Sequence, residues 1–174
     1  MISILTDKAT DSLGLALYRS ILDAGKKVKY FCLDSMHIEP CYACRGCEEK
    51  TYGRCVVRDD ADLILPCLIH SQTIIVMTSV VFGGYSFKVK RLIDKLSLII
   101  DRRYHYRQGE LVKSKTSNTA FYVIGLGDGV DQVEANHFKQ LINENIWIAA
   151  WSGEPLVLPY DKDTYEAIIL EVAG

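Results

Sequence analysis

The stretch that decides the fold is the opening of the chain, Met1-Ile-Ser-Ile-Leu-Thr-Asp-Lys-Ala-Thr-Asp-Ser12, together with Val28-Lys-Tyr-Phe-Cys-Leu33. Residues 2–6 form a short apolar run that is typical of a buried parallel strand. Apolar residues then recur at helical spacing until Gly25, which supplies a helix stop. A second strand over 28–33 completes a β–α–β unit. This unit predicts parallel pairing with a right-handed crossover.

The rest of the chain continues the alternation of strands and helices. Further strands are expected over residues 73–78, 118–124 and 146–151. Helices are expected over 61–70, from Ser86 to about residue 100, over 133–142 and over 163–172. Strands that alternate with helices and end in polar or glycine-rich loops predict an α/β fold with a three-layer, doubly wound parallel sheet. We expect a single domain over residues 1–174, with a cysteine-rich loop at 34–60 and an insertion at 101–117.

Composition narrows the function classes. Of the 174 residues 49% are apolar and 24% are charged, and the formal net charge is −2, as in an ordinary globular protein. This charge excludes a global basic field of the kind that binds nucleic acid or an anionic membrane surface. The opening residues resemble no signal peptide, and no run reaches the roughly 18 apolar residues of a membrane span. We therefore expect a cytoplasmic protein whose cysteines sit in a reducing compartment.

Four of the six cysteines lie within fifteen residues, at Cys41, Cys44, Cys47 and Cys55. The spacing C-x2-C-x2-C-x7-C is suited to a soft metal ion or an iron–sulfur cluster, because short gaps let neighbouring sulfurs turn toward one centre. Buried structural thiols or a disulfide would also account for the cysteines, and the spacing leaves both explanations open. The other two cysteines, Cys32 and Cys67, are expected in the core.

Three loops follow the predicted strands and would share the carboxyl edge of the sheet, where ligands bind in such folds. Residues 6–12 offer hydroxyls, Lys8 and a helix N-terminus, which suit a phosphate, although Asp7 and Asp11 oppose one. Residues 78–85 place Gly83 and Gly84 between aromatic residues, which would let the backbone approach a flat ring. Residues 125–129 could close a ring pocket. Each loop could equally be an ordinary turn.

The remaining polar features say less about function. Residues 102–107 are rich in Arg and Tyr, and they would form a solvated surface, contact a cofactor phosphate such as that of NADPH, or contact a partner subunit. The four histidines stand apart, without metal-ligand spacing. We therefore assign no side chain as a catalytic acid or base.

Four motifs in order resemble the NAD(P)H-dependent FMN reductase and iron–sulfur flavoprotein family. They are the cysteine motif, Arg54-Cys-Val-Val-Arg-Asp-Asp60, Thr78-Ser-Val-Val-Phe-Gly-Gly-Tyr-Ser86 and Lys90-Arg-Leu-Ile-Asp-Lys95. The resemblance covers roughly residues 1–142 and is strongest over 40–95. It implies a flavodoxin-like fold with strand order 2-1-3-4-5. It also implies a homodimer or homotetramer, with the cysteine-rich loop and residues 101–117 near the contacts.

The resemblance further implies the site residues. The FMN phosphate would lie on the first loop and the isoalloxazine ring on the other two. The implied FMN-binding residues are Thr6, Lys8, Thr10, Asp11, Ser12, Ser79, Val80, Val81, Phe82, Gly83, Gly84, Gly125, Gly127 and Asp128. A [4Fe–4S] cluster is implied on Cys41, Cys44, Cys47 and Cys55. The chain departs from the family where Lys8 replaces an arginine, Asp11 an asparagine and Ser79 a proline.

These features predict an FMN-dependent oxidoreductase that moves electrons from a reduced donor, NAD(P)H or a ferredoxin-like protein, to a flavin or small acceptor. Two other interpretations stay open. One is a flavin electron carrier without enzymatic turnover. The other is a four-cysteine metal protein that has lost FMN.

Overall fold

A computed structural model describes residues 1–98, 104–113 and 118–159. Five parallel strands form one sheet in the order β2-β1-β3-β6-β7, which is the predicted 2-1-3-4-5 order. The strands are β1 (Ile2–Thr6), β2 (Val28–Cys32), β3 (Thr73–Ser79), β6 (Ala120–Leu126) and β7 (Pro155–Leu158). Central strands β1 and β3 are almost wholly buried, as expected for a sheet covered on both faces.

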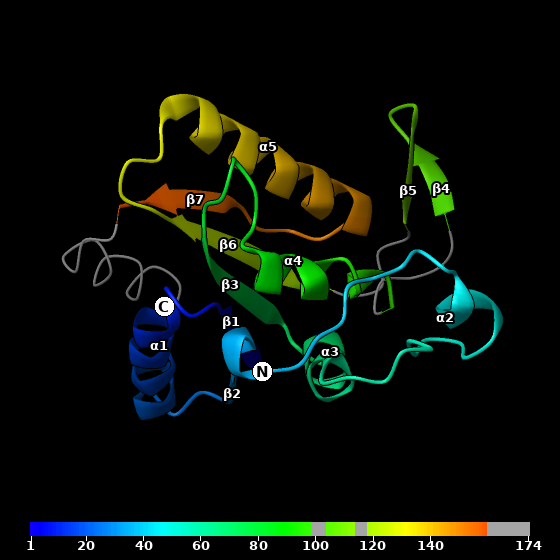
Figure 1. Cartoon of the computed structure of the whole chain (residues 1–174), viewed down its shortest axis with the longest axis horizontal. Helices are drawn as coiled ribbons and strands as arrows, with labels where there is room; N and C mark the ends of the chain where they lie inside the picture. The colour runs from blue at the N-terminus through cyan, green and yellow to red at the C-terminus, as the bar shows by residue number, and fades with distance from the viewer. Residues whose placement is uncertain (99–103, 114–117, 160–174) are drawn as a thin grey trace.

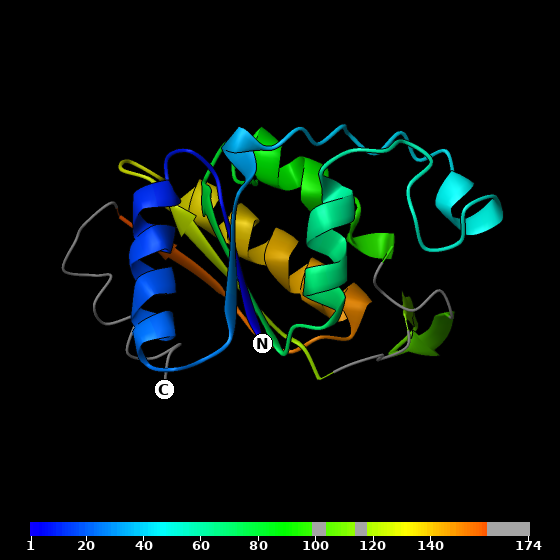
Figure 2. The same ribbon diagram turned by 90° about the horizontal axis from the view of Figure 1, so that it is seen from below.

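Among the described helices, one covers one face of the sheet and three cover the other (Figures 1 and 2). The helices are α1 (Asp11–Asp23), α3 (Ala61–Ile69), α4 (Phe87–Ile93) and α5 (Gln132–Ala149). Helix α1 packs on one face through Leu17 and Ile21, while α3, α4 and α5 pack on the other. Alternate residues of each strand point to opposite faces, so Ile4 meets α1 and Leu5 meets the other three helices.

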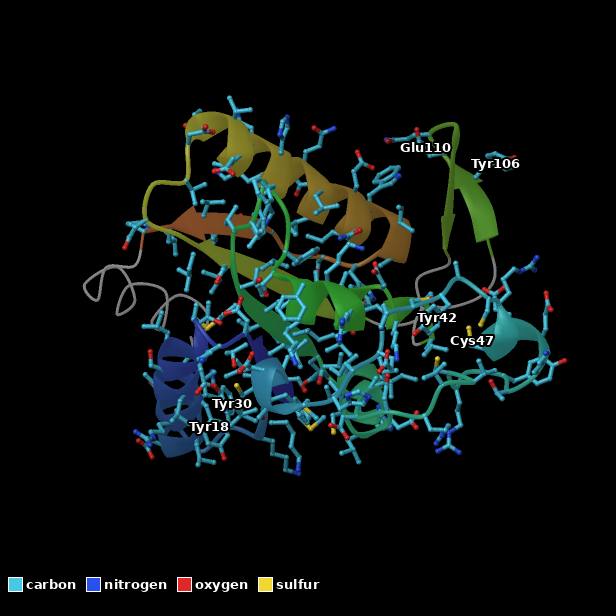
Figure 3. All side chains as sticks on the ribbon, in the orientation of Figure 1. Tyr18, Tyr30, Tyr42, Cys47, Tyr106 and Glu110 are labelled. Carbon is cyan, nitrogen blue, oxygen red and sulfur yellow. The ribbon has the colours of Figure 1, made fainter. Side chains whose placement is uncertain are left out.

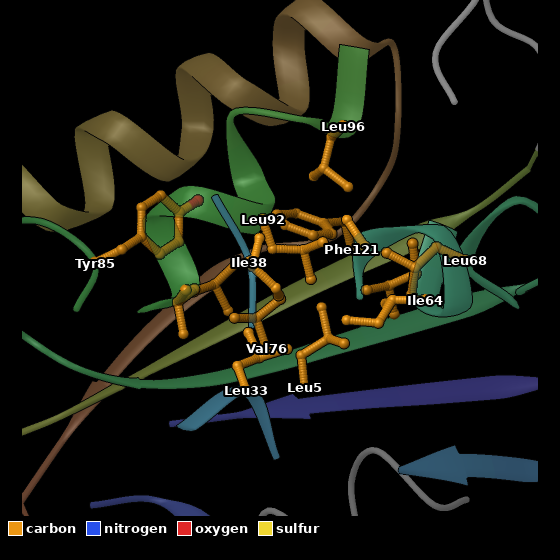
Figure 4. Packing of buried hydrophobic residues seen from close by; sticks show 14 of the residues in the cluster. Leu5, Leu33, Ile38, Ile64, Leu68, Val76, Tyr85, Leu92, Leu96 and Phe121 are labelled. Carbon is orange, nitrogen blue, oxygen red and sulfur yellow. The ribbon is translucent and has the colours of Figure 1, made fainter. Parts of the chain in front are cut away.

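The larger core lies on the face that three helices share (Figure 4). Ile64 and Leu68 of α3, Leu92 of α4 and Phe121 of β6 converge on Leu5 there, and each is at most 1% exposed. On the other face, α1 packs very close to β1. A Cβ atom added at Gly14 would lie 2.1 Å from a methyl carbon of Thr6, so α1 can sit this near β1 only with glycine there.

The strand predicted over residues 146–151 is wrong. Helix α5 continues to Ala149, and Ala150 ends it in a left-handed conformation. The fifth strand is β7, which pairs in parallel with β6 from Val123↔Pro155 onward. A short apolar run has no period of its own that separates helix from strand. Here it continues the inward-facing series that begins with Phe138 and Ile142 on α5.

Smaller elements lie outside the main layers. They are the 3-10 turns η1 (Leu33–Ser35) and η2 (Leu96–Leu98), the short helix α2 (Gly46–Glu49) and an antiparallel hairpin of β4 (Tyr104–Arg107) and β5 (Glu110–Lys113). Helix α4 stops at Ile93, earlier than predicted. The helix predicted over 163–172 lies outside the described residues. Among the helices described, none has the length and apolar character needed to cross a bilayer.

Candidate functional site

The loops after β1, β3 and β6 meet at the carboxyl edge of the sheet. Strand register brings Thr6 opposite Met77 and Thr78 opposite Gly125. The Val80 amide then donates to the Leu126 carbonyl at 3.0 Å, which carries the β3–β6 contact past the strand ends. The structure therefore brings together the three segments that the sequence singled out.

The first loop, residues 6–12, is held from within by Asp7. This side chain is buried, and its carboxylate accepts hydrogen bonds from the Thr10 amide at 3.0 Å and from the Ser79 amide at 2.7 Å. The hydroxyls of Thr10 and Thr78 also donate to it, at 3.0 and 3.3 Å. The Asp7 carboxylate thus joins the first loop to the loop after β3. Donors from two strand ends converge on this carboxylate.

Asp11, the first residue of α1, is held in a similar way. Its carboxylate accepts hydrogen bonds from the Tyr30 hydroxyl and, at 3.3 Å, from the Thr6 hydroxyl. Hydrogen bonds from Tyr30 above all, then from the Cys32 thiol, lower the pKa of Asp11, so this carboxylate is ionised at neutral pH. Burial and the hydrogen bond to Asp11 raise the pKa of Tyr30. Figure 3 shows Tyr30 beside Tyr18 against α1.

The second loop carries an exposed aromatic ring. Phe82 is 95% exposed and has a φ of 49°, and Gly83 follows with a φ of 69°. Mutual hydrogen bonds between the backbones of Val81 and Gly84, at 3.0 and 2.9 Å, close the turn that holds it. Gly83 packs on α5, because an added Cβ there would lie 2.9 Å from the Cβ of His137. The turn thus presents an apolar ring to solvent at the carboxyl edge of the sheet.

The third loop contributes packing as well as surface. Gly125 lies within β6, where an added Cβ would come within 2.7 Å of both the Phe138 ring and the Val80 side chain. Gly127 follows the strand, and its amide donates to the Leu158 carbonyl at 3.3 Å. Asp128 lies in the turn beyond. Gly125 is therefore needed to pack α5 and the second loop against β6, which a glycine-rich motif alone does not indicate.

The cysteine segment, residues 34–60, is closed at its base. The His37 amide donates to the Asp60 carboxylate at 2.7 Å, and the Asp60 amide donates to the His37 carbonyl at 3.0 Å. Beside this pair, the Glu39 amide donates to the Asp59 carboxylate at 2.8 Å. Both ends of the segment are thus tied to each other. Figure 2 shows the segment leaving the sheet beside α4 and extending past α3.

Cations of α4 and the turn after it hold this base. Lys95 and Asp59 form an ion pair in which each side chain is 1% exposed. Arg91 donates to the Ile38 carbonyl at 3.0 Å, and Lys88 donates to the Asp34 carbonyl at 3.4 Å. Burial raises the pKa of Asp59, but hydrogen bonds from Lys95 and from two backbone amides outweigh that effect and hold the pKa below its usual value.

The cysteines lie at the far end of the segment. Cys41 and Cys44 are exposed, Cys47 and Cys55 are half-buried, and no disulfide joins any of the six cysteines. The two arms of the tip pack closely, since an added Cβ at Gly46 would lie 2.5 Å from a methyl of Val56. Within the described ranges, no three His, Cys, Asp or Glu side chains are arranged to hold a metal ion.

The cysteine set nevertheless has the chemistry of a metal ligand set. Burial, and then the negative charges of Glu48, Cys55 and Cys41, raise the pKa of Cys47. Thiolates that repel one another at this spacing are stabilised by a shared cation, and four of them suit iron–sulfur clusters or zinc. The loops differ in how well they suit the two ends of an FMN molecule. The second loop suits a ring, whereas the Asp7 carboxylate of the first loop already accepts hydrogen bonds from the amides of Thr10 and Ser79.

Sequence reasoning missed several residues at these sites. Tyr30 reaches the first loop from β2, and Lys95 reaches the cysteine segment from 36 residues further along the chain. Neither pairing has a local signal, because both depend on how strands and helices stack. The prediction that Cys32 and Cys67 are core residues is wrong, since both are only half-buried. Residues 102 and 103 of the basic run lie outside the described part.

Comparisons with known proteins agree with this architecture. The chain is 33% identical over 76 residues to an iron–sulfur flavoprotein of Methanocaldococcus jannaschii, a match that covers 44% of this chain and 38% of that protein. It is 28% identical over 105 residues to an iron–sulfur flavoprotein of Archaeoglobus fulgidus, covering 60% and 52%. The matches thus span about two fifths to one half of these curated relatives. No family model matches the chain.

Solved structures are similar to this chain over nearly its whole length. An FMN-dependent NADH-azoreductase from Bacillus anthracis has a TM-score of 0.59 at 12% identity, over 99% of this chain and 94% of that one. The Trp repressor binding protein from Bacillus subtilis has a TM-score of 0.60 at 17% identity, over 99% and 96%. At such identities the likeness establishes the fold. The chain is therefore similar to iron–sulfur flavoproteins over part of its sequence, and its fold is flavodoxin-like.

Proposed function

We propose that this protein is a flavin-dependent oxidoreductase that passes electrons from a reduced donor to a flavin or a small acceptor. Homology to iron–sulfur flavoproteins supports a flavin as the cofactor, and FMN is the flavin named for the azoreductase with the same fold. NAD(P)H or a ferredoxin-like protein would be the donor. A homodimer or homotetramer is the assembly expected from the resemblance.

The observation that carries this proposal is the exposed ring of Phe82. An apolar side chain that is 95% exposed loses the stabilisation of burial, yet the turn between Val81 and Gly84 holds it in a left-handed backbone conformation. Its loop follows β3, a central strand, at the edge where α/β sheets bind ligands. A flat aromatic ligand stacked on Phe82 would account for both the exposure and the strain.

The chain's contribution to electron transfer would be binding and exclusion of water. A bound flavin supplies the redox chemistry itself, because its ring accepts a hydride or single electrons. Phe82 would form one wall for the ring, and the backbone of Val80 to Gly84 would line its polar edge. This chemistry does not require a side-chain acid or base, in agreement with the absence of a catalytic assignment.

The four cysteines are proposed to hold a [4Fe–4S] cluster. Their thiols are accessible or half-buried, and the base of their segment is held by Arg91 of α4, a helix that begins three residues after Gly84. One helix thus contacts the segment that would hold the cluster and directly follows the loop that would hold the flavin. Such a link would give the two groups a defined relative position.

The test is an absorption spectrum of protein purified without oxygen, with iron, zinc and extracted flavin measured on the same sample. Flavin bands with about four irons per chain would support both cofactors. Bleaching of the flavin by NADH or NADPH would support an enzyme that uses these donors. Bleaching only by a low-potential one-electron donor would indicate a carrier instead. A protein that holds no flavin after addition of FMN or riboflavin would contradict the proposal.

Two variants locate the flavin. Phe82→Ala should weaken flavin binding by roughly tenfold or more, because a stacked aromatic pair is worth about 0.5–1.5 kcal/mol beyond its buried area. Phe87→Ala is the matched control, because Phe87 is also exposed (64%) but belongs to α4 and lies against Lys88 and Arg91. Equal losses in both variants would remove the reason to place the ring on the second loop.

One observation favours a second function. The Asp7 carboxylate uses amides of the first and second loops, as it would in a fold that no longer binds a cofactor phosphate. The protein would then be a four-cysteine metal protein without flavin. A colourless preparation that contains about one zinc per chain, and stays colourless with added flavin, would support this alternative.

A further inference from the structure

The first loop contains two carboxylates where a flavodoxin-like fold would receive the phosphate of FMN. Asp7 and Asp11 lie at either end of the turn between β1 and α1, and Lys8 is the single cation of residues 6–12. The loop therefore has a net formal charge of −1. Both carboxylates accept hydrogen bonds from other groups of the chain. These bonds determine which donors remain for a ligand.

The Asp7 carboxylate accepts hydrogen bonds from backbone amides that a bound phosphate could otherwise use. The amides of Thr10 and Ser79 lie 3.0 and 2.7 Å from its oxygens, and the Asp7 side chain is 4% exposed. One of these amides belongs to the first loop, where the phosphate of FMN would bind, and the other comes from the end of β3 beside it. A hydrogen bond made to a buried carboxylate is expensive to break, so an incoming anion does not gain these donors.

The Asp11 carboxylate lies at the N-terminus of α1. It lies in the first turn of α1, where a carboxylate is favoured by the same partial positive charge that attracts a phosphate. Its partners are the Tyr30 and Thr6 hydroxyls and the Cys32 thiol, all of which are neutral groups. Among the described residues, none of the groups that hold the Asp11 carboxylate is a cation, so these partners do not cancel its negative charge.

A phosphate at this corner would meet like charge. A phosphate monoester carries about −1.5 to −2 charges at neutral pH. It would have Lys8 and Ser12 as partners, but it would face Asp11 at the helix terminus and Asp7 beneath the turn. Two unit charges about 4 Å apart interact by about 1 kcal/mol in water and about 4 kcal/mol near a protein surface. Riboflavin has a neutral hydroxyl at the same end and avoids this repulsion.

We propose that the site binds flavin through the ring and the ribityl chain and gains no affinity from the 5′-phosphate, so that riboflavin binds at least as tightly as FMN. This inference rests on the proposed flavin site and specifies its ligand. Its structural basis is the pair of intramolecular anchors, Asp7 to the amides of Thr10 and Ser79 and Asp11 to Tyr30.

The test is a pair of titrations on the full chain after removal of any bound flavin. Quenching of flavin fluorescence gives the dissociation constants of FMN and riboflavin at low and high salt. We expect riboflavin to bind as tightly as FMN or more tightly. We also expect the affinity of FMN, relative to riboflavin, to rise with salt between about 0.01 and 0.5 M, because salt screens repulsion between charges. Tighter binding of FMN that weakens with salt would overturn the proposal.

A charge-neutral variant sharpens the test. Asp11→Asn keeps the shape of the side chain and should tighten FMN binding by roughly tenfold while changing riboflavin binding by less than about twofold. Asp23→Asn is the matched control, since Asp23 lies at the other end of the same helix and carries the same charge. An unchanged ratio of the two affinities in Asp11→Asn would contradict the inference even if that variant binds flavin normally.

Failure of this inference differs from failure of the proposed function. Preference for FMN, with normal binding, overturns the inference and leaves a flavoprotein. Absence of binding for both flavins overturns the proposed function, and the inference with it. Mass spectrometry of flavin extracted from purified protein gives an independent reading, in which riboflavin is expected and FMN alone would count against the proposal.

Discussion

The first loop follows β1 and the cysteine segment follows β2, so both begin at the carboxyl edge of the sheet. Their polar groups find partners in different ways. In the first loop, the polar groups are bound to one another, and Asp7 is buried with four donors from the chain itself. In the cysteine segment, hydrogen bonds to the carboxylates of Asp59 and Asp60 hold the base, whereas Cys41 and Cys44 at the tip are exposed. The first loop is thus complete without a ligand, whereas the cysteine segment leaves Cys41 and Cys44 accessible to one.

The largest effect is expected at the base of the cysteine segment. Lys95→Met leaves the Asp59 carboxylate buried without its cation, which should lower the free energy of unfolding by about 3–5 kcal/mol. Lys90→Met is the control, because Lys90 pairs with Asp94 on the surface and should cost at most about 0.5 kcal/mol. Urea denaturation of both variants measures the difference. Similar losses in the two variants would show that the base is not anchored as described.

A smaller effect is expected in the first loop. Asp7→Asn keeps the size of the side chain but turns an NH2 group toward amide donors, which should cost about 1–3 kcal/mol in unfolding free energy. Asp23→Asn, on the exposed end of α1, should leave that free energy unchanged to within about 0.5 kcal/mol. Thermal and urea unfolding provide the measurement. A neutral Asp7→Asn would mean that the loop is not held by this carboxylate.

The pH dependence of stability separates the two regions further. The folded-state pKa of Asp59 lies below its ordinary value of 3.8, so its contribution is complete above that pH and is lost as pH falls through the folded pKa. Unfolding free energies measured between about pH 6 and 2 should therefore decrease in acid, and Asp59→Asn should flatten this decrease. An unchanged acid limb in that variant would contradict the lowered pKa.

The smallest energetic effect, but the sharpest chemical one, is expected at the cysteine tip. Alkylation followed by mass spectrometry should modify Cys41 and Cys44 faster than Cys47, because burial and neighbouring negative charge raise the pKa of Cys47. Bound iron or zinc should protect the four clustered cysteines together. Cys67, half-buried on α3, is the internal control and should stay equally reactive. Protection of all the thiols alike would argue against a specific four-cysteine site.

Predictability differed between local and long-range features. The carboxyl-edge loops could be placed from sequence, because parallel strands end at a common edge. The fifth strand could not be placed. Residues 146–149 have a composition that suits either structure, and they became helix because α5 already presents Phe138 and Ile142 to the core one and two turns earlier. The partners of Asp11 and Asp59 were equally unpredictable, since Tyr30 and Lys95 come from other elements.

The sequence by itself determined the class of fold, the strand order implied by its family resemblance, and the grouping of four cysteines on one segment. These depend on hydrophobic period and short-range spacing, which neighbouring residues carry. Only the tertiary structure decided which polar groups are already bound. It directs the amides of Thr10 and Ser79 to Asp7, and it buries Lys95 against Asp59. The pairing of Asp7 with Ser79 joins residues 72 positions apart, and that of Asp59 with Lys95 joins residues 36 positions apart. A buried charge finds such a distant partner only when the surrounding elements have packed.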